Sequence, residues 1–249
     1  MYLQNGEDKT GKLLFQTVYV FFGKYILISF FVFILAGCLS GQRPPVRISP
    51  ELDKRIYQIP PLPVTVGLYI EPELHDFVQK VPLKRYDPAT PYYVFPDFVF
   101  PVGESLASRI KDMSKILFHK VIQIDNPQDK EYLKREALDG ILSIGLKNSD
   151  IDIYIDISVW RAIGRHNLSI IASFSDPHLN EIWKSEIAVE GKGFDFATSK
   201  VEREWWATTG PNFAPAVDDA IQKLVYELAQ SIVASIEISD YVYKRNVFD

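Results

Sequence analysis

The residues with the clearest capacity for chemistry are Leu35, Ala36, Gly37 and Cys38, which close an apolar run over residues 25–36. Cys38 is the single cysteine of the chain, so its thiol has no internal partner for a disulfide. The small residues before it leave an extended backbone that a protease can grip, and a thiol can carry a thioether-linked lipid. The apolar run is long enough to enter a translocon but shorter than the roughly 20 residues of a stable membrane span.

A short apolar segment, small residues and then a cysteine form the lipobox of a bacterial lipoprotein signal peptide. We therefore predict that residues 1–37 are a signal peptide, that residues 35–37 are recognised by the signal peptidase, and that Cys38 carries diacylglycerol and a further acyl chain such as palmitate. Several acyl chains exceed what stable anchoring requires, at about 0.8 kcal/mol per buried CH₂. An uncleaved anchor over residues 13–36 is the alternative, although Lys24 interrupts that longer run.

The residue after the cysteine and the overall charge indicate a location. Leu39 stands where an aspartate would be the usual signal for retention in the inner membrane, so we expect the outer membrane, with the domain facing the periplasm. With Cys38 lipidated no thiol remains for disulfides, and the domain must be held by its core alone. The net charge of −5 without a basic stripe argues against a nucleic-acid partner.

Composition divides the remaining chain into a tether and a domain. Residues 38–63 are rich in proline and are predicted to be an extended tether that spaces the domain from the lipid. Residues 64–249 are predicted to be a periplasmic α+β domain, which opens with a strand over Val64–Ile70. An irregular stretch over 72–101 follows. Its aromatic segment Tyr92–Phe100 fits either a buried strand with loops or an aromatic patch for a partner or a membrane surface.

Periodicity along the rest of the chain predicts helices that flank a meander. Helices are expected over 105–118, over 127–138 with Asn126 as cap, and over 216–236, and a strand over 120–124. The meander is expected to have strands over 140–147, 150–162, 168–174 and 181–190, with turns at 148–149, 164–167 and 176–180. This order predicts an α+β fold: a mixed sheet with a C-terminal antiparallel meander and helices packed on one face.

Short motifs along this order resemble a known family. They are Phe118-x-x-Val121, Asp139-Gly-Ile-Leu, a turn opening on Asp176, Ile182-Trp-Lys-Ser, and Ala216-x-x-x-Ala220-Ile221. Together they resemble the periplasmic α/β domain of envelope lipoproteins of the curli-export and Pel-polysaccharide type, over about residues 64–235. The resemblance implies outer-membrane lipoproteins that assemble into rings, or that support export and envelope assembly, without catalytic residues. The long segments 72–101 and 191–215 depart from that pattern and favour an accessory role over a secretion pore.

Trp205 and Trp206 are the strongest candidates for a binding site. They stand in a predicted long loop over 191–215, beside the charged residues 202–204. Paired tryptophans bury a large area per residue and are common anchors of protein interfaces. The pair is therefore predicted to bind a partner; the alternative is a lid that folds back over the sheet.

The remaining polar candidates do not have the spacing that a metal or catalytic site requires. Asp150, Asp152 and Asp156 alternate along one strand face, but a strand spreads such oxygens about 6–7 Å apart, which suits a solvated face better than a calcium site. The four histidines, at 75, 119, 166 and 178, follow no zinc-binding spacing. Ser105 lacks the second glycine of a nucleophile elbow. The sequence therefore predicts no metal, no cofactor and no catalytic residue.

The expected function is that of a lipid-anchored, non-enzymatic envelope protein that acts as an assembly or export accessory through contacts with other envelope proteins, and that could form a homo-oligomer. The alternative is a lipoprotein that binds a lipid or a glycan, with Tyr92–Phe100 and Trp205-Trp206 lining an aromatic pocket. An apolar tunnel would favour the alternative, and a flat aromatic surface would favour contacts between proteins.

Overall fold

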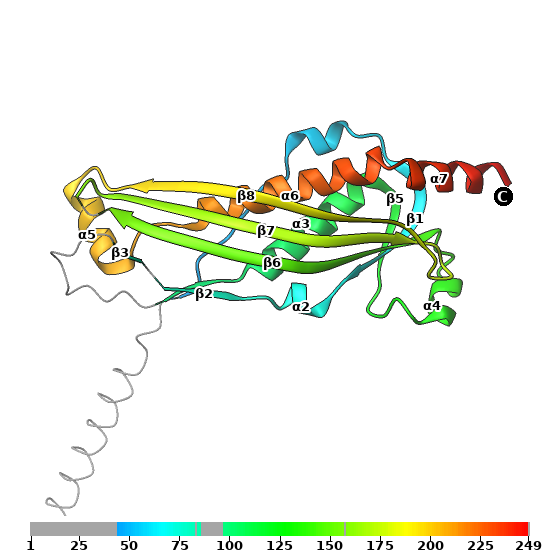
Figure 1. The fold of residues 1–249 in the computed structure, drawn as a ribbon, viewed down its shortest axis with the longest axis horizontal. Coiled ribbons are helices and arrows are strands. Elements are labelled where there is room, and N and C mark those ends of the chain that lie inside the picture. Colours follow the sequence, from blue (N-terminus) through cyan, green and yellow to red (C-terminus); the bar gives the residue numbers. More distant parts are fainter. Residues whose placement is uncertain (1–43, 83, 86–96, 157, 249) are drawn as a thin grey trace, which may run out of the picture. The chain divides into compact units, whose positions relative to one another are not determined.

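The fold is given by a computed structural model, which describes residues 44–248 except 83, 86–96 and 157 (Figure 1). The predicted lipidation site Cys38 and the recognition residues Leu35, Ala36 and Gly37 lie outside the described residues.

A mixed sheet of six strands organises the domain. Its order is β5-β1-β6-β7-β8, and a short strand β3 also pairs with β6. The bounds are β1 Leu62–Ile70, β3 Lys84–Arg85, β5 Phe118–Gln123, β6 Gly140–Asp156, β7 Arg161–Ser175 and β8 Glu181–Phe196. Strand β1 runs parallel to β5 and β6, whereas β6, β7 and β8 form an antiparallel meander. The predicted α+β class and mixed sheet are confirmed.

The meander has three long strands, and two of the predicted turns are wrong. Residues 148–149 lie within β6, where a β-bulge between Leu146 and Asn148 absorbs an extra residue. Residues 164–167 lie within β7, paired with both neighbouring strands. The chain turns instead at residues 158–160 and, as predicted, between β7 and β8.

Two helices cover one face of the sheet: α3, Val102–Leu117, and α6, Ala214–Ala234 (Figure 1). Both follow from helical spacing of apolar residues, and the predicted stripe of α6, including Ile221, Leu224 and Leu228, is fully buried up to Ile232. Ile236, predicted as its last member, lies beyond the end of α6 and is exposed, so the helix ends earlier than predicted. Glycines at the end of β8 let α6 approach closely, because a Cβ on Gly191 or Gly193 would collide with the α6 backbone. Burial of this stripe contributes to the stability of the domain.

The remaining helices are short or lie at the ends of the chain. They are the 3₁₀ helix η1 Lys54–Gln58, α2 Pro72–His75, α4 Lys130–Arg135, α5 Lys200–Thr209 and α7 Ile236–Phe248. Helix α4 begins later than predicted, because Asp129 rather than Asn126 caps it; the Asn126 side chain accepts from the Gln128 backbone in the preceding turn. The small two-stranded sheet joins β2, Gln79–Val81, to β4, Phe98–Phe100.

The predicted tether is largely part of the domain. Ile56 in η1 is fully buried, and η1 packs against α3 and α6. Upstream, the backbone N–H of Val46 donates to the carbonyl of Val99 in β4 at 2.8 Å, and that of Ser49 donates to Asp218 in α6. The proline-rich residues 44–50 are extended, as expected, but they lie along the domain instead of leading away from it. The prediction of a spacer over residues 44–63 is therefore wrong.

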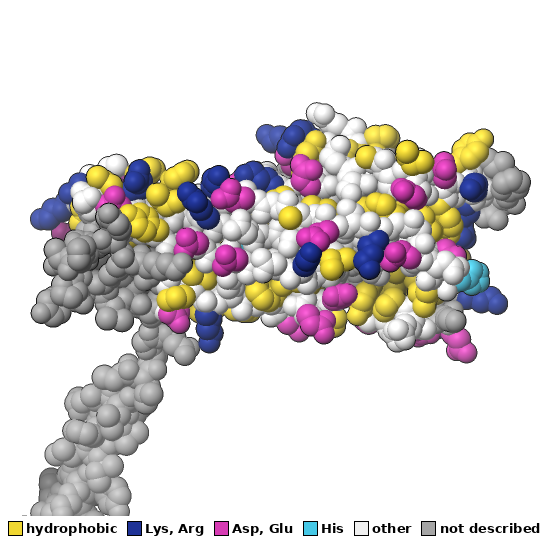
Figure 2. Space-filling model, viewed as in Figure 1, with side chains coloured by type: hydrophobic (Ala, Val, Ile, Leu, Met, Phe, Trp, Pro, Cys, Tyr) yellow, Lys and Arg dark blue, Asp and Glu magenta, His cyan; other side chains and the backbone are white. Residues whose placement is uncertain are grey.

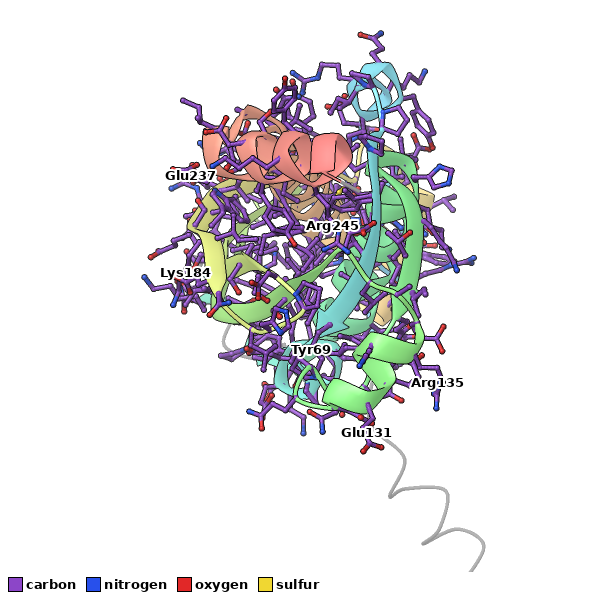
Figure 3. All side chains as sticks on the ribbon, turned by 90° about the vertical axis from the view of Figure 1, so that its right-hand side faces the viewer. Tyr69, Glu131, Arg135, Lys184, Glu237 and Arg245 are labelled. Atoms are coloured by element: carbon purple, nitrogen blue, oxygen red, sulfur yellow. The ribbon has the colours of Figure 1, made fainter. Side chains whose placement is uncertain are left out.

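Helix α7, absent from the sequence predictions, is fastened to the start of β6. The Tyr241 hydroxyl donates to the carbonyl of Asp139 at 2.7 Å, and Arg245 forms an ion pair with the same residue at 2.8 Å. Figure 3 looks onto this end of the domain, with Arg245 lying between α7 and the sheet. The Phe174 ring meets Tyr241 edge-on, so α7 closes the core at the end remote from α5.

Candidate functional site

The two tryptophans predicted as a pair have different environments. Both lie on helix α5, where the sequence predicted a loop. Trp206 is 6% exposed and belongs to the core, with its ring centroid 6.4 Å from that of Trp160 in the β6–β7 turn. Trp205 is 64% exposed. A helix points adjacent side chains in different directions, which is why one tryptophan covers the sheet and the other faces solvent.

Helix α5 is held firmly at its start. Ser199 and Glu202 form a reciprocal capping box, and the Glu202 carboxylate also accepts from Thr198. Backbone donation from Ser199, followed by the bonds from Thr198, lowers the pKa of Glu202 to about 2. The Arg203 guanidinium lies over the Trp160 ring and donates to the carbonyl of Ala197. Trp205 is therefore presented on a rigid support.

Other apolar side chains are exposed at the same end of the domain. We call this set the aromatic end; each member is more than half exposed, and the set comprises Val159, Phe194, Phe196, Val201 and Trp205. Figure 2 shows hydrophobic side chains gathered there beside lysines and arginines, at the end that carries α5 in Figure 1. Exposed apolar groups that collect in one place mark surfaces for proteins or membranes.

Strand register explains how the meander contributes to this surface. Phe194 and Phe196 alternate with the helix-facing residues of β8, so they lie on the face of the sheet that α3 and α6 leave uncovered. Phe194 is opposite Ile163 of β7, which is in turn opposite Tyr154 of β6. An apolar row thus crosses three strands beside the turn.

A pocket of about 440 Å³ lies beside Trp205. Its lining includes Phe196 and Trp206 but also the polar residues Asp195, Glu202 and Asn212. The backbone N–H of Asn212 donates to the Asp195 carboxylate at 2.7 Å, which fastens the segment before α6 to the end of β8. This lining is mixed in polarity and does not form an apolar tunnel.

The aromatic stretch of the sequence is not part of this pocket. Phe98 and Phe100 are buried in the core, and Phe98 meets Phe213 edge-on at 5.0 Å between ring centroids. For these residues the interpretation as a buried strand is confirmed; residues 92–96 lie outside the described part.

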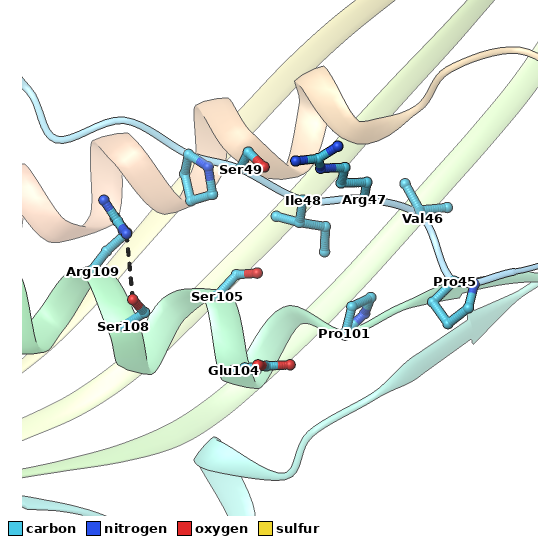
Figure 4. A pocket seen from close by; sticks show the side chains of 11 residues that line it. Pro45, Val46, Arg47, Ile48, Ser49, Pro101, Glu104, Ser105, Ser108 and Arg109 are labelled. Atoms are coloured by element: carbon cyan, nitrogen blue, oxygen red, sulfur yellow. Dashed lines mark hydrogen bonds between the residues drawn. The ribbon is translucent and has the colours of Figure 1, made fainter.

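Another pocket, of about 670 Å³, lies between the extended N-terminal segment and α3 (Figure 4). Pro45, Ile48 and Pro101 line it together with Glu104, Ser105 and Arg109. Ser105, weighed above as a nucleophile, is here one of several partly buried polar groups, and the drawn hydrogen bond joins its neighbours Arg109 and Ser108.

A buried hydrogen-bonded chain was missed by the sequence reasoning. His166 of β7 is fully buried, and its Nε2 lies 2.9 Å from the hydroxyl of Ser149, which donates to the side chain of Gln79 in β2 at 2.8 Å. Because that hydroxyl has one hydrogen, His166 is the donor to it, and Nδ1 has no partner among the described residues. Burial lowers the pKa of His166 to about 4. The histidine ties the β2–β4 sheet to the meander.

The remaining candidates are not brought together. Asp150 and Asp152 are exposed on β6, and Asp156 accepts from Ser158 in the turn. His75, His119 and His178 are exposed at separate places. Among the described residues no three histidine, cysteine, aspartate or glutamate side chains are grouped to hold a metal ion. In the same part of the chain, no helix is both long and apolar enough to cross a bilayer.

Comparisons with known proteins give likenesses of fold at low identity. No family model and no curated protein matches the chain. Among solved structures, XCC0632 from Xanthomonas campestris, of family model DUF330, is 12% identical with a TM-score of 0.38, over 77% of this chain and 93% of that one. A minor lipoprotein from Acinetobacter baumannii is 9% identical with a TM-score of 0.33, over 70% and 94%. The PelC dodecamer from Paraburkholderia phytofirmans is 13% identical with a TM-score of 0.27, over 68% and 90%.

Proposed function

We propose that this chain is a lipid-anchored envelope protein that acts without catalysis, as an assembly or export accessory that makes contacts with other envelope proteins. The observation that carries the proposal is the exposure of Trp205 on the capped helix α5. The adjacent residue of the same helix, Trp206, is buried in the core and holds the helix in place. A rigid, solvent-facing aromatic side chain loses little conformational entropy on binding, which is what an interface anchor requires. The lipobox supplies the membrane anchor.

The alternative, a pocket for a lipid or glycan, has less support. It requires Phe98, Phe100, Trp205 and Trp206 to line one cavity, whereas three of them are buried in the core and one is exposed. The pocket beside Trp205 has carboxylates in its lining. The described residues therefore favour a contact surface.

The anchor is tested by metabolic labelling. Cells given labelled palmitate are expected to incorporate it into the wild-type protein, because the thiol and the new amino group of Cys38 are the acceptors. Cys38→Ala should give an unlabelled, unprocessed precursor. A wild-type protein that stays unlabelled, while a known lipoprotein in the same cells is labelled, would exclude the lipid anchor.

The contact surface is tested with Trp205→Ala. Its melting temperature is expected to stay within the error of the wild type, because Trp205 is mostly exposed, whereas crosslinking to partners or to other copies should fall by tenfold or more, as for an anchor worth about 2 kcal/mol. Tyr57→Ala, an equally exposed aromatic on η1, is the matched control and should leave crosslinking intact. Equal crosslinking by wild type and Trp205→Ala would remove Trp205 as the anchor.

A further inference from the structure

We infer that the aromatic end lies against the lipid bilayer itself, with Phe194 and Phe196 in contact with the lipid interface. This inference rests on the proposed lipid anchor and deepens it, because it states which end of the domain the anchor holds at the membrane. It starts from the length of chain between Cys38 and the first described residue.

The reach of that chain is short. Residues 44–63 pack on the domain and cannot act as a spacer. The length available between the lipid and the domain is therefore limited to the five residues between Cys38 and Pro44. Whatever their conformation, the six Cα steps from Cys38 to Pro44 span at most about 20 Å. The sheet, by contrast, is about 55 Å long along the 17 residues of β6. The lipid is therefore tied near one place on an elongated domain.

That place is next to the aromatic end. Val46 is hydrogen-bonded to Val99 of β4, and the neighbouring Phe98 packs against Phe213. Phe213 in turn lies against Gly164 of β7, which is paired with Gly193, the residue before Phe194. Figure 1 shows the same order: the first described residues enter nearer to α5 than to α7. A short connection between the lipid and this part of the domain brings the aromatic end to the membrane and keeps α7 away from it.

The chemistry of the aromatic end suits an uncharged lipid interface. Phenylalanine side chains partition into the interfacial region, and two cations near them form ion pairs: Arg161 with Asp156 at 3.9 Å, Lys192 with Glu190 at 2.8 Å. Paired charges give little attraction to anionic headgroups, so the contact is expected with zwitterionic lipid and should be insensitive to salt. Trp205 lines the same pocket as Phe196, so a partner bound through Trp205 would be met at the bilayer surface.

The test places a fluorophore at either end of the full-length, lipidated protein in phosphatidylcholine vesicles. Since the Cys38 thiol is taken up by lipid, Phe196→Cys and Tyr243→Cys each offer a single thiol for an environment-sensitive dye; both positions are exposed, and Tyr243 lies on α7. We expect nitroxide-bearing phosphatidylcholine to quench the dye at position 196 several-fold more than at position 243, in low and high salt alike.

Each other outcome overturns the inference in its own way. Equal quenching at both positions would mean that the domain lies flat or stands clear of the bilayer. A dye at position 196 that is shielded without quenching, increasingly so with protein density, would assign the surface to a second copy. Dye uptake by the wild-type protein would show that Cys38 is not lipidated; the proposed anchor then fails, and the inference that rests on its short reach fails with it.

Discussion

Replacing Trp206 by alanine is expected to destabilise the domain by roughly 3–5 kcal/mol, the range for truncating a large buried aromatic side chain. Trp206 packs against Trp160, which has a φ of 51° in the turn between β6 and β7. A bulky residue in this left-handed conformation is strained and persists where its surroundings fix it. Loss of the Trp206 ring therefore removes both the buried contact and the support of the strained turn.

Chemical denaturation of Trp206→Ala beside Trp205→Ala measures this difference. The two variants delete the same side chain at adjacent positions of one helix, so helix propensity and composition are matched. The structure predicts a large loss for position 206 and almost none for position 205. Comparable losses at both positions would mean that α5 folds over the sheet as a lid and that Trp205 contributes to stability rather than to contacts.

The sequence predicts the core elements of this fold well, because their patterns are strong. The alternation from residue 64, and the apolar spacing behind α3 and α6, each describe a face that must be buried. The turns of the meander are harder to predict. Residues 148–149 and 164–167 have the polar and glycine composition of turns, yet one pair adjoins a bulge and Gly164 provides room for Ala216 of α6. Only the packing of α6 against β7 shows that position 164 requires a glycine.

The candidate site is predictable in part for a similar reason. A tryptophan pair beside charged residues indicates an exposed segment, but which tryptophan is exposed depends on the start of α5, set by the capping box of Ser199 and Glu202. Phe194 and Phe196 carry a readable signal, since two aromatics at a spacing of two lie on one strand face. The glycines at 191 and 193 indicate a loop and mask that signal, although β8 continues to Phe196.

The proline-rich segment shows how the same composition can serve two roles. An extended chain with few backbone N–H donors can lead away from a domain or lie along it. Which of the two occurs depends on apolar residues such as Ile56, which is buried where η1 packs against α3 and α6. Because it lies along the domain, the free length between lipid and domain shrinks to a few residues. A lipid on Cys38, as proposed above, would then fix the orientation of the domain as well as its location.

Acid is expected to weaken the domain through His166. Its pKa is about 4 in the folded state and about 6.5 when unfolded, because the buried ring resists a positive charge. The unfolded chain therefore binds the proton first as pH falls. Above about pH 6.5 the neutral ring costs nothing, and stability is lost as pH falls from about 6.5 towards 4, by roughly 3 kcal/mol in full.

The histidine's place in the structure makes this loss specific. Nε2 already donates to Ser149, so a second proton would go to Nδ1, which has no partner among the described residues. That proton would place a positive charge in the buried region where Ser149 joins His166 to Gln79 of the β2–β4 sheet.

Urea denaturation of wild type and His166→Gln between pH 7 and pH 5 tests this account, in a window above the range in which most carboxylates titrate. The glutamine can still donate to Ser149 but cannot take up a proton, so its stability should change little across the window, whereas wild type should lose roughly 2 kcal/mol. His178→Gln, at an exposed position in the β7–β8 turn, is the matched control and should keep the wild-type slope. If His166→Gln loses stability with the same slope as wild type, the acid sensitivity arises elsewhere and the buried histidine is only a packing element.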